Sequence, residues 1–222
     1  MPPQKTIAST PPTVARGPYQ NGIRRRRAII LAASRIYAAH GFNSGTLRQI
    51  AREVGVTPAA LARHCTSKED LLLAVLQNWD TESRARNPHN IRGLAHFIGL
   101  RDSVIHNQAN RQVIELYLTL SAEATHPSHP ARAFIQQRFK MIVRSSVKLL
   151  QQAREAGEIL PMDDATIVAE VHALYAMMDG IQMQWLINPK TDLVSIFSHA
   201  LNATLERWTG RKNVLPPLGV KA

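Results

Sequence analysis

The chain has 222 residues, of which 45% are hydrophobic and 19% charged, a composition that is ordinary for a globular protein of one or two domains. Its 27 Lys and Arg outnumber its 16 Asp and Glu, so its formal net charge of +11 indicates a polyanionic partner such as nucleic acid or an anionic membrane surface. The single cysteine excludes an internal disulfide framework and a cysteine-rich zinc site, and no stretch approaches the roughly 18 uncharged apolar residues of a membrane span. Because no apolar signal segment begins the chain, we expect a cytoplasmic protein.

The positive charge is concentrated in the first third of the chain. Residues 1–70 carry eleven Lys or Arg and three acidic residues, whereas residues 71–222 carry 16 basic and 13 acidic residues. This asymmetry predicts a small anion-binding domain attached to a larger and nearly neutral one. A basic surface that is merely solvated is the alternative interpretation.

The N-terminal segment shows neither a helical nor a strand period. Residues 1–23 hold five prolines and no acidic residue, which predicts a disordered basic arm. Four consecutive arginines, Arg24 to Arg27, follow, and their side chains would point all round a helix toward phosphate or water. Apolar residues with helical spacing then occupy residues 28–39, and Gly41 is placed to end that helix.

Two short helices separated by a glycine are predicted over residues 46–65. Thr46 begins a capping box in front of the first helix, and Gly55 ends that helix. Thr57 and Pro58 then begin the second helix, as an N-cap and as a first residue that needs no N–H partner. The arrangement is typical of a helix-turn-helix motif, in which the second helix lies in the major groove of DNA.

The rest of the chain predicts helices throughout, with no strand period and no internal repeat. Apolar residues with helical spacing place these helices near residues 67–84, 87–107, 113–124, 130–156, 163–187 and 191–208. The helix over residues 163–187 is apolar or small on nearly every side, which indicates burial on more than one face.

The segment over residues 24–75 resembles the tetracycline-repressor (TetR) family of bacterial transcription regulators. The matching residues are Ala32, Ala33, Tyr37, Gly41, Phe42, Thr46, Ile50, Ala51, Gly55, Val56, Thr57, Leu61, His64 and the run Ser67 to Leu72. Two positions depart from the family pattern, with Ala62 in place of a usual tyrosine and Cys65 in place of a usual phenylalanine. Two further segments, 118–124 and 179–189, resemble one broad subgroup of the family.

The resemblance implies an all-α fold with an N-terminal helix-turn-helix three-helix head and a larger helical domain for effector binding and dimerisation. The predicted boundaries are 1–23 for the disordered arm, 24–70 for the DNA-binding domain, 71–210 for the effector-binding and dimerisation domain and 211–222 for a C-terminal tail. We therefore expect a homodimeric repressor that binds a palindromic double-stranded DNA operator and is released by a small, largely apolar effector. The alternative is a DNA-binding protein whose helical body binds a protein partner instead of a small molecule.

The residues expected to contact DNA are basic, cap a helix or belong to the second short helix. They are Arg24, Arg25, Arg26, Arg27, Thr46, Arg48, Thr57, Pro58, Ala59, Ala60, Arg63, His64 and Lys68. Arg63 is the best candidate for a contact with guanine, because a guanidinium reads the two acceptors of that base.

The expected effector-binding residues mix aromatic, polar and sulfur-containing side chains, as pockets between helices do. They are Tyr117, Ser121, Phe134, Phe139, His172, Tyr175, Met178, Asp179 and Met183. Ordinary core filling is the alternative interpretation of this set. The resemblance also places a dimer interface on the last two helices, at Ile181, Trp185, Phe197, Leu201 and Leu205, although a helix central in a monomer core would show the same pattern.

Other reactive side chains have simpler interpretations. His126 and His129 flank prolines in a turn, without the further ligands of a metal site. Cys65 has no neighbouring cysteine with which a redox sensor would react, so a packed thiol is expected. No phosphate-binding glycine loop, nucleophile elbow or zinc-protease motif is present, and we expect no catalytic residue, metal or cofactor.

Overall fold

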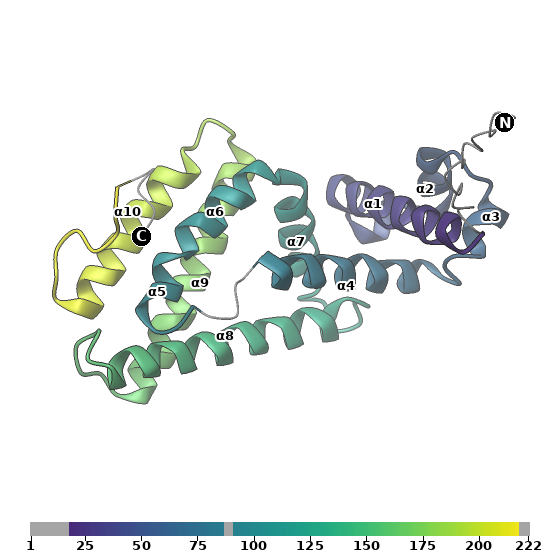
Figure 1. Ribbon diagram of the computed structural model, residues 1–222. Coiled ribbons are helices and arrows are strands. Elements are labelled where there is room, and N and C mark those ends of the chain that lie inside the picture. The colour runs from purple at the N-terminus through teal and green to yellow at the C-terminus, as the bar shows by residue number, and fades with distance from the viewer. Residues whose placement is uncertain (1–17, 87–90, 218–222) are drawn as a thin grey trace, which may run out of the picture.

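The computed structural model describes residues 18–86 and 91–217, and in these residues the chain forms ten α-helices and no strand (Figure 1). The helices are α1 (Pro18–Ser44), α2 (Leu47–Val54), α3 (Pro58–Ala62), α4 (Lys68–Arg86), α5 (Leu94–Ile98), α6 (Leu100–Ala109), α7 (Arg111–Glu123), α8 (Arg132–Glu155), α9 (Asp164–Ile187) and α10 (Leu193–Thr209). The all-α prediction is confirmed. None of the described helices has the combination of length and apolar character that crossing a membrane requires.

The first helix is longer than the sequence predicts. It begins at Pro18, where a proline loses no hydrogen bond, so residues 18–23 are helical rather than part of a disordered arm. The remaining residues of the predicted arm, 1–17, lie outside the described part of the chain. Gly41, with φ of 73° and ψ of 167°, is not helical, so the regular helix ends there as predicted, and a short helical turn after this kink completes α1 at Ser44.

The predicted pair of short helices forms α2 and α3. Thr46 and Gln49 make both hydrogen bonds of a capping box at the start of α2. The hydroxyl of Thr57 accepts the backbone N–H of Ala60 at 3.1 Å and so caps α3. Helix α3 ends at Ala62, three residues before the predicted end of the second helix.

One predicted body helix is divided in two. The helix expected over residues 87–107 corresponds to α5 and α6, which meet at Gly99, and residues 87–90 lie outside the described part. The other body helices begin and end within a few residues of the predicted limits. Asp163 and Asp192 cap the starts of α9 and α10, which local sequence can indicate.

Buried apolar side chains form two clusters. The first, called the head core here, joins α1–α4 to α7 and α8, and its members include Ile29, Tyr37, Ile50, Leu61, Leu72, Leu76, Trp79, Leu116, Leu120 and Ile135. The second, called the body core, joins α5, α6, α8, α9 and α10, and its members include Phe97, Val104, Leu150, Ile167, Leu174, Phe197, Leu201 and Trp208. Figure 1 shows the head (α1–α3) on the right and the body (α5–α10) on the left, with α4 running between them.

The expected dimer residues lie inside the body core. Ile181, Trp185, Phe197, Leu201 and Leu205 are each at most 8% exposed in the single chain. These side chains pack within their own protomer and leave little surface for a second copy. Their burial fits the alternative interpretation, in which they belong to the core of one protomer.

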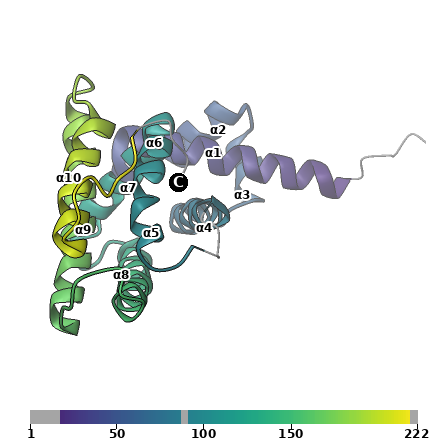
Figure 2. The same ribbon diagram turned by 60° about the vertical axis from the view of Figure 1, so that its left-hand side comes forward.

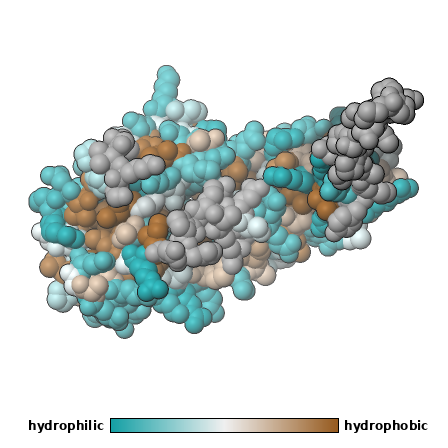
Figure 3. Space-filling model, viewed as in Figure 1, coloured by the Kyte–Doolittle hydropathy of each residue, from teal (hydrophilic) through white to brown (hydrophobic). Residues whose placement is uncertain are grey.

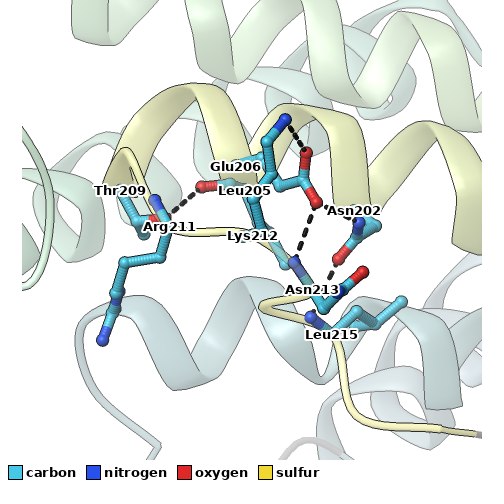
Figure 4. A network of polar contacts seen from close by, with 8 residues as sticks. All are labelled: Asn202, Leu205, Glu206, Thr209, Arg211, Lys212, Asn213 and Leu215. Carbon is cyan, nitrogen blue, oxygen red and sulfur yellow. Dashed lines mark hydrogen bonds and ion pairs between the residues drawn. The ribbon is translucent and has the colours of Figure 1, made fainter.

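The segment that follows α10 is folded back on that helix (Figure 4). The carboxylate of Glu206 accepts the backbone N–H of Asn213 at 2.8 Å and the ammonium of Lys212 at 3.1 Å. The backbone N–H of Leu215 donates to Asn202 at 3.0 Å, and Leu215 packs against the body core. Residues 211–217 of the predicted tail are therefore part of the folded body.

On the face drawn in Figure 3, hydrophobic residues gather over the body between hydrophilic borders. Most of the exposed large hydrophobic side chains also belong to the body rather than to the head, with Ile187 the most exposed at 79%. The apolar surface is thus concentrated at the end of the molecule that is distant from the basic segment.

Candidate nucleic-acid interface and internal cavity

Arginines of the head lie on its surface around the two short helices. Arg24 to Arg27 are all exposed in α1, Arg48 is exposed in α2, and Arg63 is the exposed C-cap of α3. The guanidinium of Arg26 donates to the carbonyl oxygen of His64 at 3.4 Å, which places the arginine run beside the end of α3. The head therefore presents positive charge next to the helix that a helix-turn-helix inserts into DNA.

Several predicted DNA-contacting residues also hold the head together. Thr46 and Thr57 cap α2 and α3 with their hydroxyl groups. The ammonium of Lys68 donates to the carbonyl of Asn43 at 3.0 Å and lies 4.4 Å from the centroid of the Phe42 ring. Pro58 and Ala59 of α3 are exposed and Ala60 is half-buried. Arg52 of α2 is also exposed. It was not among the predicted DNA-contacting residues and entered the sequence analysis only through the charge count of residues 1–70.

The two departures from the family pattern lie three residues apart in the chain and differ in burial. Cys65 is buried in the head core, and its thiol donates to the carbonyl of Leu61 at 3.7 Å. Burial, more than any neighbouring charge, raises the pKa of this thiol, so Cys65 packs as a neutral side chain. Ala62 is exposed at the end of α3.

A glutamate of the body fixes the kink of α1. The carboxylate of Glu123, at the end of α7, accepts the backbone N–H of Phe42 at 3.0 Å. A Cβ atom at Gly41 would collide with the same carboxylate, so both the positive φ and this close approach require glycine there. Glu123 also lies 3.4 Å from Nε2 of His129, whose ring meets that of Phe42 edge-on at 5.4 Å.

The two histidines weighed as a metal pair have different surroundings. His129 is buried, and its Nδ1 accepts the backbone N–H of Ala131 at 3.2 Å. His126 is exposed, and its ring nitrogen lies 2.9 Å from the hydroxyl of Ser128. Over residues 18–86 and 91–217, no three His, Cys, Asp or Glu side chains gather in a group that could hold a metal ion.

A cavity of about 110 Å³ lies between α4, α6, α7, α8 and α9. Its lining residues are Trp79, His106, Asn107, Asn110, Val113, Ile114, Tyr117, Arg138, Phe139, Ile142, Val143, Tyr175, Met178, Asp179 and Gln182. Trp79 belongs to the head core, whereas Tyr175 and Met178 pack against the body core. The cavity is therefore located where the two cores meet.

The structure brings together five of the nine residues expected in a pocket, namely Tyr117, Phe139, Tyr175, Met178 and Asp179. The other four lie elsewhere. Phe134 packs against the head core, and Ser121 is absent from the cavity wall. His172 and Met183 are exposed on the outer side of α9.

Helical spacing could have predicted one cavity residue, Gln182, that the sequence analysis did not include. Tyr175, Met178, Asp179 and Gln182 follow one another at i, i+3, i+4 and i+7 and so share one face of α9. Gln182 is buried, and its amide oxygen accepts a hydrogen bond from Asn107 at 2.7 Å. The contributions of α4 and α6, in contrast, depend on contacts between segments that are distant in sequence.

Tyr117, Tyr175 and Asp179 of the cavity wall are half-buried and hydrogen-bonded. The hydroxyl of Tyr117 donates to the carboxylate of Asp179 at 3.1 Å. Burial raises the pKa of Asp179 to about 6, while the hydrogen bond from Tyr117 and the positive charge of Arg138 lower it by less. Tyr175 and Ser146 share a hydrogen bond of 2.8 Å, and burial raises the pKa of both tyrosines, which remain neutral.

A capped pair of short helices in a basic head, joined to a helical body that contains a cavity, defines a helix-turn-helix regulator. Residues 29–75 match the sequence model of the bacterial regulatory proteins of the tetR family. The regulator UidR of Escherichia coli (strain K12) is 25% identical over 137 residues, which cover 61% of this chain and 69% of UidR. The repressor BepR of Brucella suis is 23% identical over 198 residues, which cover 85% of this chain and 94% of BepR.

The fold is shared with solved regulators. A transcriptional regulator from Saccharomonospora viridis, crystallised in complex with choline, superposes with a TM-score of 0.69 at 21% identity, over 83% of this chain and 96% of that one. Residues 29–75 thus match the DNA-binding segment of the tetR family, and the described chain shares its fold with solved regulators.

Proposed function

We propose that this chain is a repressor that binds a palindromic operator as a dimer and leaves it when a small molecule occupies the cavity. The observation that carries the proposal is the position of Trp79, which belongs to the head core and also lines the cavity. Trp79 lies on α4, a helix that begins at Lys68, close after the recognition helix α3. A ligand in the cavity therefore touches the helix that leads to the DNA-binding surface.

A molecule in the cavity changes DNA affinity only if it favours one arrangement of the heads over another. Successive major-groove faces of a palindrome lie about 34–36 Å apart, so a shift of α4 by a few ångströms would alter the fit of two heads. The presence of a cavity supports a small molecule over a protein partner as the effector. The similarity to BepR, which is named a repressor, supports the direction of the response.

For the DNA complex, we assign base recognition to Arg63 and phosphate contacts to Arg48 and to the run Arg24 to Arg27. Replacement of Arg63 by alanine should cost about 1–3 kcal/mol of operator binding and relax the preference at one base pair per half-site. Arg48→Ala is the matched control, because loss of a phosphate contact weakens binding about equally on all sequences and reduces the salt dependence. A selection from random duplexes, followed by titration at several salt concentrations, measures both effects. A uniform loss on all sequences for Arg63→Ala would refute its role in base recognition.

The dimer contact is assigned to the outer faces of α9 and α10, which lie at the edge of the body away from the head (Figure 2). On α9, small residues share this exposed side, and a Cβ atom added at Gly180 would meet nothing within 4 Å. The exposed residues of this face are Val168, Ala169, His172, Ala173, Ala176, Met183, Ile187, Ile196, His199 and Ala203. Small side chains at helical spacing permit close approach of a symmetric copy. Ala176→Glu should give monomers that remain folded, as measured by sedimentation and circular dichroism, and a stable dimer would place the interface elsewhere.

The role of the cavity is tested by filling it. Val143→Trp adds bulk to the lining, whereas Ile105→Trp places the same side chain on the exposed face of α6 as a control. The filled variant should bind DNA and fail to respond to any effector that releases the parent protein. If an effector still dissociates the DNA complex of Val143→Trp, the cavity is not its binding site.

A further inference from the structure

The walls of the cavity are rich in aromatic rings contributed by four helices. Trp79, Tyr117, Phe139 and Tyr175 come from α4, α7, α8 and α9 respectively. The ring centroids of Trp79 and Tyr117 are 5.1 Å apart, and those of Tyr117 and Phe139 are 6.2 Å apart. The negative faces of aromatic rings attract cations, and several rings around one space recognise ammonium groups.

A carboxylate occupies the same space. Asp179 lines the cavity, and the hydrogen bond that it accepts from Tyr117 comes from a neutral phenol. The guanidinium of Arg138 also lines the cavity but is held over the Trp79 ring, with 3.8 Å between its central carbon and the ring centroid. Asp179 thus accepts a hydrogen bond from Tyr117, and among the described residues it forms no ion pair.

The pKa of Asp179 agrees with this geometry. The cost of burying its charge outweighs the stabilisation by Tyr117 and Arg138, so that its pKa rises to about 6. Near neutral pH the group is therefore mostly ionised and incompletely neutralised. A bound cation would supply the missing charge without exposing the carboxylate to water.

The size of the cavity limits the cation. An apolar protein cavity of about 150 Å³ accommodates benzene. At about 110 Å³, this cavity has room for a compact molecule. A small quaternary or tertiary ammonium group is the cationic chemistry that fits both this volume and an aromatic lining.

We propose that the cavity binds a small organic cation, with the carboxylate of Asp179 as its counter-ion and the four aromatic rings as its walls. This assignment rests on the proposed function, in which the same cavity holds the effector, and it names the chemical class of that effector. It replaces the expectation of a largely apolar effector with one that is apolar in its substituents and positive at its centre.

Three probes of similar compact shape and different charge test the assignment. Tetramethylammonium, tert-butanol and pivalate are titrated calorimetrically into the full chain at about pH 8, where Asp179 is ionised. Tetramethylammonium should bind at least about tenfold more tightly than tert-butanol, and pivalate should not bind. The affinity of the protein for tetramethylammonium should decrease as the pH falls through the pKa of Asp179.

Asp179→Asn retains the shape of the side chain and an acceptor for Tyr117 but removes the charge. It should weaken tetramethylammonium binding by about tenfold or more and abolish its pH dependence, while tert-butanol binding stays unchanged. Asp102→Asn, the same substitution at an exposed position of α6, should leave all three titrations unaltered. Undiminished binding of the cation to Asp179→Asn, tighter binding of tert-butanol or pivalate, or absence of saturable cation binding would each overturn the proposal.

A parallel titration against a bound DNA duplex separates this assignment from the proposed function. If tetramethylammonium binds through Asp179 and the DNA complex persists at saturation, the ligand class holds and the proposed release mechanism fails. If a neutral or anionic compound releases DNA from the parent protein but not from Val143→Trp, the release mechanism holds and the cationic ligand class is wrong.

Discussion

The head core and the body core fix a turn in the same way, with a glutamate that accepts the backbone N–H following a glycine of positive φ. In the head, Glu123 accepts from Phe42 after Gly41, at 3.0 Å. In the body, Glu158 accepts from Leu94 after Gly93, at 2.7 Å. At both glycines a Cβ atom would collide with the glutamate, so neither turn tolerates a side chain.

The two turns differ in what they connect. Glu158 joins the start of α5 to the segment after α8, and both belong to the body. Glu123 joins α1 of the head to α7 of the body, and buried His129 packs beside it. The Glu158 contact thus connects two segments of the body, whereas the Glu123 contact connects the head to the body. This difference predicts that equivalent substitutions at the two sites have unequal effects on DNA binding.

The largest expected effect comes from breaking the body core. Trp208 is fully buried, packs edge-on against Phe97 at 5.0 Å and donates to Glu170 at 2.9 Å, so Trp208→Ala should cost about 3–5 kcal/mol of stability. Because α7 and α8 also build the head core, head and body should unfold in one transition. Equal calorimetric and van't Hoff enthalpies of unfolding would confirm a single transition. Two separate transitions would show that the cores are independent.

A smaller effect on stability, of opposite sign, is expected for a substitution of Asp179, which lies where the two cores meet. The pKa of Asp179 is about 6 in the folded chain and 3.8 for the unperturbed group, so its ionisation costs stability as the pH rises through this window. Asp179→Asn should therefore stabilise the protein by at most about 3 kcal/mol above pH 6, with no gain below about pH 4. The charged and titratable groups that line the same cavity are His106, Tyr117, Arg138 and Tyr175. Urea unfolding at several pH values tests the prediction, and a pH-independent gain would contradict it.

The comparison between the two turns is tested directly by Glu123→Ala and Glu158→Ala. Each substitution leaves a backbone N–H without its acceptor and should cost about 1–3 kcal/mol of stability. Glu123→Ala should in addition change operator affinity, because it loosens the connection between α1 and α7, whereas Glu158→Ala should not. Denaturant titration and DNA binding are measured on both variants. Equal operator affinities in the two variants would show that the Glu123 contact has no role in relating head to body.

The smallest effects are expected for exposed ion pairs, one in each region. Arg35 and Glu53 of the head are 3.0 Å apart, with side chains 48% and 45% exposed, and Arg35→Ala should change stability by less than about 0.5 kcal/mol. In the body, Arg207 donates twice to Glu170, whose side chain is only 21% exposed. Arg207→Ala should cost up to about 1 kcal/mol, and the cost should decrease in salt. A larger loss from Arg35→Ala would reverse this ranking.

Local sequence patterns predicted the helices and the head well. The helix starts at Thr46 and at Thr57–Pro58 depend only on residues close in sequence. They could therefore be predicted without tertiary information. Local patterns predicted the interruption of the helix at Gly41 but not the contact made there. The carboxylate of Glu123, which accepts the N–H of Phe42, lies 82 residues further along the chain than Gly41.

For the candidate site, the sequence indicated which side chains were suitable but not where they would meet. Tyr117 and Asp179 were predicted as pocket residues from their aromatic and polar side chains, and both line the cavity. His172 was predicted on the same grounds, but its side chain is exposed. On α9, nearly every side is apolar or small, so the sequence alone does not separate the face that packs inward from the exposed one. The inward face was determined by contacts of α9 with α7, α8 and α10. Helix formation depends on hydrogen bonds between residues three to five positions apart, whereas a cavity depends on packing among helices distant in sequence, and only the tertiary structure determines that packing.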